Sequence, residues 1–149
     1  MAKFEEFLED LPLLVEVGLI AIKQGDEDSA HKLFNAVGIL DPKNTVRKMG
    51  LGLVAMHKLD LATAKKYFQE ISDEEPLNYR ATTFLGLSYV LTAFEDTASK
   101  EEKIDCLKKG TEIAIKVANE PKAPDSERKL AHSILELEKE LHEKTAQKA

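Results

Sequence analysis

The sequence predicts an all-α fold built from repeated pairs of antiparallel helices. Three glycines, Gly18, Gly52 and Gly86, follow one another at equal intervals, and each lies between an aliphatic residue and a leucine. Apolar residues between them recur at steps of three and four, which is typical of amphipathic helices. A fixed period of about 34 residues indicates repeated helix pairs that stack to bury a continuous core.

Further residues recur with the same period and mark the parts of each pair. Asp26 and Asp60 stand where the second helix begins, and an aspartate there can accept a hydrogen bond from a free backbone N–H. A proline closes each of the first two units, because proline cannot continue a helix but can begin one. We expect ten residues to pack the helices together: Gly18, Ala30, Phe34, Pro42, Gly52, Ala64, Phe68, Pro76, Gly86 and Tyr89.

One domain is expected over residues 1–149, since the chain is too short for two ordinary domains. Three helix pairs would form a right-handed superhelical stack with a short N-terminal helix and a C-terminal capping helix. The predicted pairs cover residues 11–44, 45–78 and 79–120.

The third pair is interrupted by an insertion near residues 92–103. Ser99 and Glu102 form a capping box, which predicts that the second helix of this pair begins at Lys100. A helix over residues 3–10 precedes the repeats. Another over residues 125–145 follows them, with a polar outer face of the kind that a repeat stack needs at its end.

This arrangement resembles the tetratricopeptide repeat: a glycine, an Ala-x-x-x-Phe step and a closing proline recur with one common period. The match is strong over the first two units and partial in the third. The resemblance implies a curved stack in which the first helix of each pair lines the concave side.

The inner face of those helices would fall at fixed offsets from each glycine, and most residues there are apolar. Either this groove accepts an amphipathic helix from a partner, or the chain's own terminal helices cover it. Only Arg80 is basic at these offsets, which argues against clamping of a chaperone's C-terminal carboxylate. The predicted groove residues are Val15, Leu19, Ile22, Val46, Met49, Leu53, Met56, Thr83, Leu87 and Val90.

The composition argues against several other classes of protein. The net charge of −6 disfavours nucleic acid as the main partner, and the single cysteine, Cys106, excludes an internal disulfide. No apolar run is long enough to insert into a membrane. The sequence has no nucleotide-binding glycine motif and no helical pair of histidines for a metal. We therefore expect a cytoplasmic protein that is not an enzyme and has no cofactor, metal site or catalytic residue.

Short acidic proteins with about three such repeats resemble the repeat-type chaperones of bacterial type III secretion. The resemblance favours the subclass that holds a needle subunit together with a second small co-chaperone. It implies that an amphipathic helix of the needle subunit lies in the groove, which prevents premature polymerisation. The alternatives are a chaperone of the translocators, a general adaptor or assembly scaffold, and a module that associates with itself.

Overall fold

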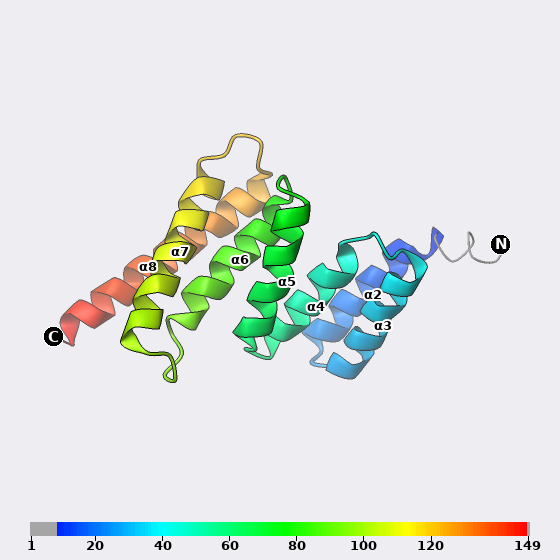
Figure 1. Cartoon of the computed structure of the whole chain (residues 1–149), viewed down its shortest axis with the longest axis horizontal. Coiled ribbons are helices and arrows are strands. Elements are labelled where there is room, and N and C mark those ends of the chain that lie inside the picture. Colours follow the sequence, from blue (N-terminus) through cyan, green and yellow to red (C-terminus); the bar gives the residue numbers. More distant parts are fainter. Residues whose placement is uncertain (1–8, 149) are drawn as a thin grey trace. The chain divides into compact units, whose positions relative to one another are not determined.

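The computed structural model describes residues 9–148, and every regular element in that range is an α-helix (Figure 1). No strand occurs between these residues, so the predicted all-α class is confirmed. The expected helix over residues 3–10 lies almost wholly outside the described residues. The helices are α2 (Leu11–Lys23), α3 (Glu27–Leu40), α4 (Val46–His57), α5 (Leu61–Glu74), α6 (Tyr79–Thr92), α7 (Lys100–Ala118) and α8 (Asp125–Gln147).

Side-chain caps fix where several helices begin. The Asp26 carboxylate accepts the backbone N–H of Ser29 at 3.1 Å, at the start of α3. Asp60 plays the same part before α5, where it accepts the N–H of Thr63 at 3.2 Å. Ser99 accepts the N–H of Glu102 at 3.1 Å, and α7 begins at Lys100 as predicted. These caps pair backbone donors that the first turn of a helix leaves free.

The α2–α3 and α4–α5 turns share one backbone geometry at repeat-equivalent positions. Each contains a residue with a left-handed conformation, Gly25 at φ 74° and Leu59 at φ 60°. In both turns the N–H of this residue donates to the carbonyl three residues earlier at 3.0 Å. The N–H of the following aspartate donates to the carbonyl five residues earlier at 2.9 Å. The sequence period is therefore also a period of the backbone.

Two compact units make up the chain, Met1–Tyr67 and Phe68–Ala149, and their boundary falls within α5. In the first unit, the fully buried ring of Phe34 lies at the centre of the core. A Cβ atom at Gly18 would come within 2.8 Å of this ring, and one at Gly50 within 2.2 Å. The two glycines therefore let α2 and α4 approach Phe34 closely. The buried residues of this core are Ala21, Ala30, Phe34, Leu51 and Val54.

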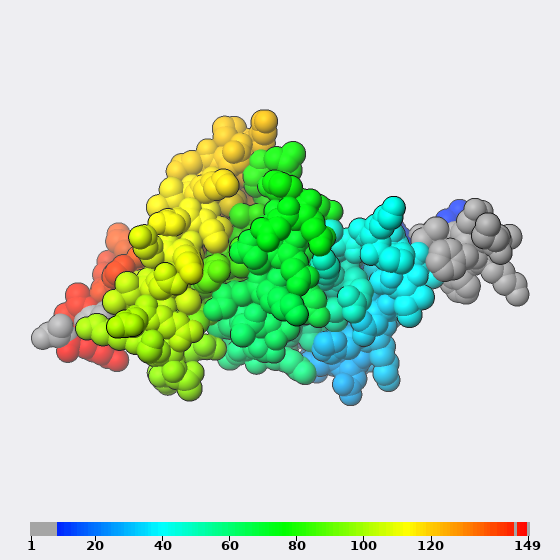
Figure 2. Space-filling view, in the orientation of Figure 1, coloured from blue at the N-terminus to red at the C-terminus, as the bar shows by residue number. Residues whose placement is uncertain are grey.

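In the second unit, α7 packs against both α6 and α8. Gly86 and Gly110 face each other where α6 and α7 cross, because a Cβ atom at Gly110 would lie 2.8 Å from the Gly86 carbonyl oxygen. The rings of Phe68 and Phe84 stack with centroids 5.6 Å apart. Side chains fill the spaces between the ribbons, and the space-filling view shows a continuous surface over the yellow residues of α7 (Figure 2).

Most of the residues expected to pack the repeats are buried. Ala30, Phe34, Ala64 and Phe68 have no exposed surface, and Gly18, Gly52 and Gly86 are buried. Pro42 and Pro76 instead lie exposed, each two residues beyond the end of a helix. Tyr89 is half-buried, with the Lys109 ammonium 5.7 Å from its ring centroid.

Candidate functional site

A hollow in the first unit lies between α2 and α4. Its apolar walls are Leu19 and Ile22 from α2 and Leu53 and Met56 from α4, around a volume of about 350 Å³. These four residues stand one and four positions after Gly18 and Gly52. The structure therefore brings together four of the predicted groove residues from two different helices. We call this hollow the α2–α4 groove.

The local sequence explains why these side chains meet. Residues three apart on a helix lie on the same face, so each helix contributes a pair. Leu19 and Ile22 also pack against the buried core around Phe34, which gives the α2 side of the groove a firm base. All four side chains remain partly accessible to solvent. The groove is thus a supported apolar surface with room for further side chains.

The polar part of the groove consists of Lys23 and His57, which end α2 and α4. The next residue, Lys58, binds Glu27 at 2.7 Å, and this hydrogen bond raises the pKa of the Lys58 ammonium. Among the described residues, no carboxylate, hydroxyl or thiol lines the groove beside the histidine. The groove therefore presents an apolar surface with a lysine and a histidine at one end.

Three other predicted groove residues lie on the same two helices. Val15, Val46 and Met49 are all half-buried, and Val15 packs against the core around Phe34. They do not line the α2–α4 groove, whose walls come from the C-terminal halves of the helices. The predicted face is therefore present along α2 and α4, but only part of it is hollowed.

In the second unit the structure differs from the expected groove. Val90 is fully buried in a cluster with Ala114 of α7 and Ile134 of α8. Leu87 packs against the same cluster and stays half-buried. Thr83 has no exposed surface, and its hydroxyl donates to the Tyr79 carbonyl at 2.6 Å. Thr83 and Val90 thus cannot line an open groove in this structure.

Val90 is buried because the apolar stripe of α8 packs against α6 and α7. The sequence analysis left two alternatives for the groove, a partner helix or the chain's own terminal helices. At Val90 the second applies, because the C-terminal helix α8 covers this residue. Leu130 and Leu137 of α8 belong to the same packing. On this part of α6, the chain fills the position that a partner helix was expected to take.

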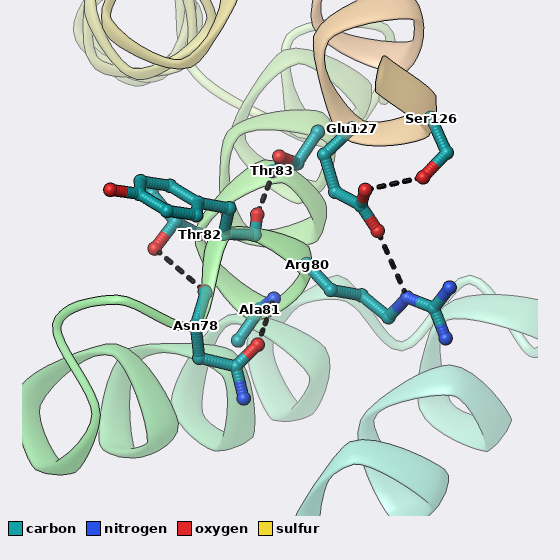
Figure 3. Close-up of polar contacts among 8 residues, drawn as sticks. Asn78, Arg80, Ala81, Thr82, Thr83, Ser126 and Glu127 are labelled. Carbon is teal, nitrogen blue, oxygen red and sulfur yellow. Dashed lines mark hydrogen bonds and ion pairs between the residues drawn. The ribbon is translucent and has the colours of Figure 1, made fainter. Parts of the chain in front are cut away.

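A polar contact joins the N-terminal ends of α6 and α8 (Figure 3). The Nε atom of Arg80 donates to Glu127 Oε1 at 3.2 Å, and the Ser126 hydroxyl donates to the other carboxylate oxygen. Burial tends to raise the pKa of Glu127, but the hydrogen bonds from Ser126 and Arg80, a backbone hydrogen bond and the charge of Arg80 together lower the pKa from its usual range. Arg80 therefore has a partner within the chain.

A second hollow, of about 310 Å³, lies between α7 and α8 and was not predicted. Its apolar part includes Ile104, of which 60% is exposed, and its polar part includes His142, paired with Glu138 at 2.7 Å. No direct signal in the sequence predicts this hollow, because the residues on its two sides are not related by the repeat period. Its lining is Ile104, Leu107, Lys108, Thr111, Glu112, Glu138 and His142.

Between residues 9 and 148, no three His, Cys, Asp or Glu side chains lie close enough together to hold a metal ion. Cys106 is a buried free thiol. No helix in the described part of the chain is both long enough and apolar enough to cross a bilayer. No protein-family model matches the sequence, and no curated protein is significantly similar to it.

Proposed function

We propose that the protein is a non-enzymatic binding module whose α2–α4 groove holds an amphipathic helix of a partner protein. The observation that carries this proposal is the meeting of Leu19, Ile22, Leu53 and Met56 around one accessible apolar hollow. An amphipathic helix presents apolar side chains at steps of three and four, which suit a groove walled by two helices. Methionine adapts to side chains of differing shape, so Met56 favours a binding role.

The expected strength of such binding follows from the area that it removes from water. A helix that buries four large apolar side chains gains on the order of 6–10 kcal/mol before the free energy of ordering is subtracted. At the upper end, an association cost of about 4 kcal/mol leaves about 6 kcal/mol, which corresponds to a dissociation constant of tens of micromolar. The groove therefore has the capacity for a specific but reversible complex.

The architecture that we infer for this role is a tetratricopeptide-like stack. Its support is the constant spacing of Gly18, Gly52 and Gly86 together with the repeated turn geometry at Gly25 and Leu59. In such a stack the first helices of successive pairs lie side by side, as α2 and α4 do. The hollow between α2 and α4 would then be part of the concave side.

The partner that the resemblance favours is a needle subunit of a type III secretion system, bound in the cytoplasm with a second small co-chaperone. Covering the helix through which the subunit polymerises would keep it monomeric until export. The alternatives are a translocator, or a client of a general adaptor. A second copy of this chain would be the occupant of a self-associating module.

The test is Leu53→Asp, with Ile39→Asp as its matched control. Leu53 lines the groove, whereas Ile39 lies on α3, is 73% exposed and is not part of the groove. The probe is a fluorescent peptide helix with leucines at steps of three and four. A buried, unpaired carboxylate should weaken binding by about 2–4 kcal/mol in the Leu53 variant and leave the control unchanged. Circular dichroism should show the same helicity in all three proteins.

Loss of helicity on Leu53→Asp would identify Leu53 as a core residue and contradict the groove assignment. Gly52→Leu provides the comparison, because overpacking a buried helix contact should unfold or destabilise the protein. Co-expression with the needle subunit of the same genome tests the secretion role by itself. A peptide that binds while the subunit does not would retain the groove and exclude that partner.

A further inference from the structure

The helix α8 covers the residues of α6 that correspond to the walls of the α2–α4 groove. Leu87 and Val90 stand one and four positions after Gly86, and the groove walls on α4 have the same offsets from their own glycine. Both residues belong to one packed cluster with an aliphatic stripe of α8. The second unit therefore contains an internal example of a helix that covers this pair of repeat positions. The stripe, with steps of four and three, consists of Leu130, Ile134 and Leu137.

The covering helix also supplies a carboxylate to the cation at the end of this face. Arg80 stands on the predicted inner face at the N-terminal end of α6, where its Nε atom donates to Glu127 of α8 at 3.2 Å (Figure 3). Glu127 lies in the first turn of α8, three residues before the aliphatic stripe begins. In this unit, one helix thus combines an acidic first turn with an aliphatic stripe.

The α2–α4 groove also ends in basic side chains. Lys23 and His57 line it at the C-terminal ends of α2 and α4, and both are exposed. Of the carboxylates that follow these helix ends along the chain, Glu27 binds Lys58 at 2.7 Å, and the charge of Asp28 also acts on that lysine. The two turn aspartates cap α3 and α5. The lysine and histidine of the groove therefore offer a carboxylate of a bound helix a positive charge and a hydrogen-bond donor.

We propose that the groove binds a helix with the same two features, aliphatic residues at steps of four and three and a carboxylate in its first turn. This inference rests on the proposed function and specifies the chemistry of the partner helix. The first-turn carboxylate pairs with Lys23, so the bound helix runs antiparallel to α2 and α4. That direction also sets the positive end of its dipole against the negative C-terminal ends of the two helices.

The experiment is a double-mutant cycle between Lys23 and a synthetic peptide helix. The peptide copies the acidic and aliphatic spacing of α8, with alanine and glutamine at all other positions. A second peptide has glutamine in place of the glutamate, and a third carries the glutamate in its last turn. Each is titrated by fluorescence anisotropy into the full-length parent, Lys23→Gln and Lys66→Gln. Lys66 is the matched control, because it is an exposed lysine of α5 that does not line the groove.

The measured quantity is the ratio of the dissociation constants of the glutamine and first-turn glutamate peptides. We expect this ratio to be about threefold larger for the parent and for Lys66→Gln than for Lys23→Gln. The cycle cancels the helicity that an acidic first turn adds to the free peptide, because this effect is the same for every protein. The coupling should disappear in about 1 M salt, which screens exposed charges.

Four results would overturn the proposal. A ratio that Lys23→Gln leaves unchanged would exclude the charge pairing, and the groove assignment would stand if Leu53→Asp still abolishes binding. Coupling of Lys23 to the last-turn glutamate would reverse the direction of the bound helix. A dimer of the parent in analytical ultracentrifugation that Leu53→Asp dissociates would assign the groove to a second copy. Failure of every peptide to bind the parent would contradict the proposed function as well.

Discussion

Leu59→Gly is expected to stabilise the protein, which is unusual for removal of a large apolar side chain. Leu59 adopts φ 60° in the α4–α5 turn, a left-handed conformation that L-residues other than glycine rarely take. Its side chain is 67% exposed, so the substitution removes little buried area. The repeat-equivalent residue in the α2–α3 turn is Gly25, with the same hydrogen bonds.

The magnitude follows from two opposing terms. The left-handed conformation costs an L-residue roughly 1–2 kcal/mol, and this strain disappears in the variant. Glycine loses about 0.5–1 kcal/mol more conformational entropy on folding than other residues. The net gain for Leu59→Gly is therefore about 0.5–1 kcal/mol. For a chain of this size, that corresponds to an increase in Tm of roughly 2–3 °C.

The reciprocal variant, Gly25→Leu, provides a matched control. Apart from Gly25 and its chain neighbours, no described atom lies within 4 Å of the position of a Cβ at Gly25, so the main cost expected of the substitution is the left-handed backbone conformation. It should lower the free energy of unfolding by about 0.5–1 kcal/mol. Urea unfolding followed by circular dichroism at one temperature measures both variants. A Leu59→Gly protein less stable than the parent would refute the reasoning and show that the exposed leucine contributes contacts that outweigh its strain.

Three further perturbations test other parts of the fold. Gly50→Ala should destabilise by about 1–3 kcal/mol because its Cβ would lie 2.2 Å from a buried aromatic ring. Gly38→Ala is its control and should cost less, since its Cβ meets the flexible side chain of Arg47, which can move away by giving up its exposed hydrogen bonds to Asn35. Glu127→Gln should lower stability by about 1 kcal/mol at neutral pH. Because the folded-state pKa of Glu127 is lowered, this contribution is present above pH 4.5 and is lost as the pH falls through the folded value. The unfolding free energies of the variant and the parent, measured by urea titration at several pH values, should therefore converge in acid. Ser99→Ala should cost about 1 kcal/mol and accelerate amide hydrogen exchange in the first turn of α7, whereas unchanged exchange would argue against the cap.

The sequence predicted helix boundaries well where a single local interaction determines them. Asp26, Asp60 and Ser99 each cap a helix through a backbone N–H three residues away, so the whole interaction is contained in a few consecutive letters. The pairing of Leu19 and Ile22 with Leu53 and Met56 was also within reach, because the repeat period carries each helix face onto its neighbour. Local rules and the period together were enough for most of the helix boundaries and for this pairing.

Contacts that depend on how two particular helices cross could not be predicted from the sequence. Gly50 and Gly110 both lie inside helices, and an isolated glycine there signals close packing without naming its partner. The structure identifies the partners as the Phe34 ring and the α6 backbone at Gly86. The ion pair between Arg80 and Glu127 likewise joins residues 47 positions apart and follows no period.

The distribution of accessible apolar surface follows from which faces the chain covers with its own helices. In the second unit, Ile134 of α8 buries Val90, so the inner face of α6 is partly closed. In the first unit, α2 and α4 meet around a hollow for which the described residues supply no such cover. A partner helix would therefore bury the most apolar surface at Leu53 and Met56. At Val90 it would bury little unless it displaced the packed helix α8. We therefore place the proposed binding in the first unit, because α8 already covers part of the corresponding face of α6 in the second unit.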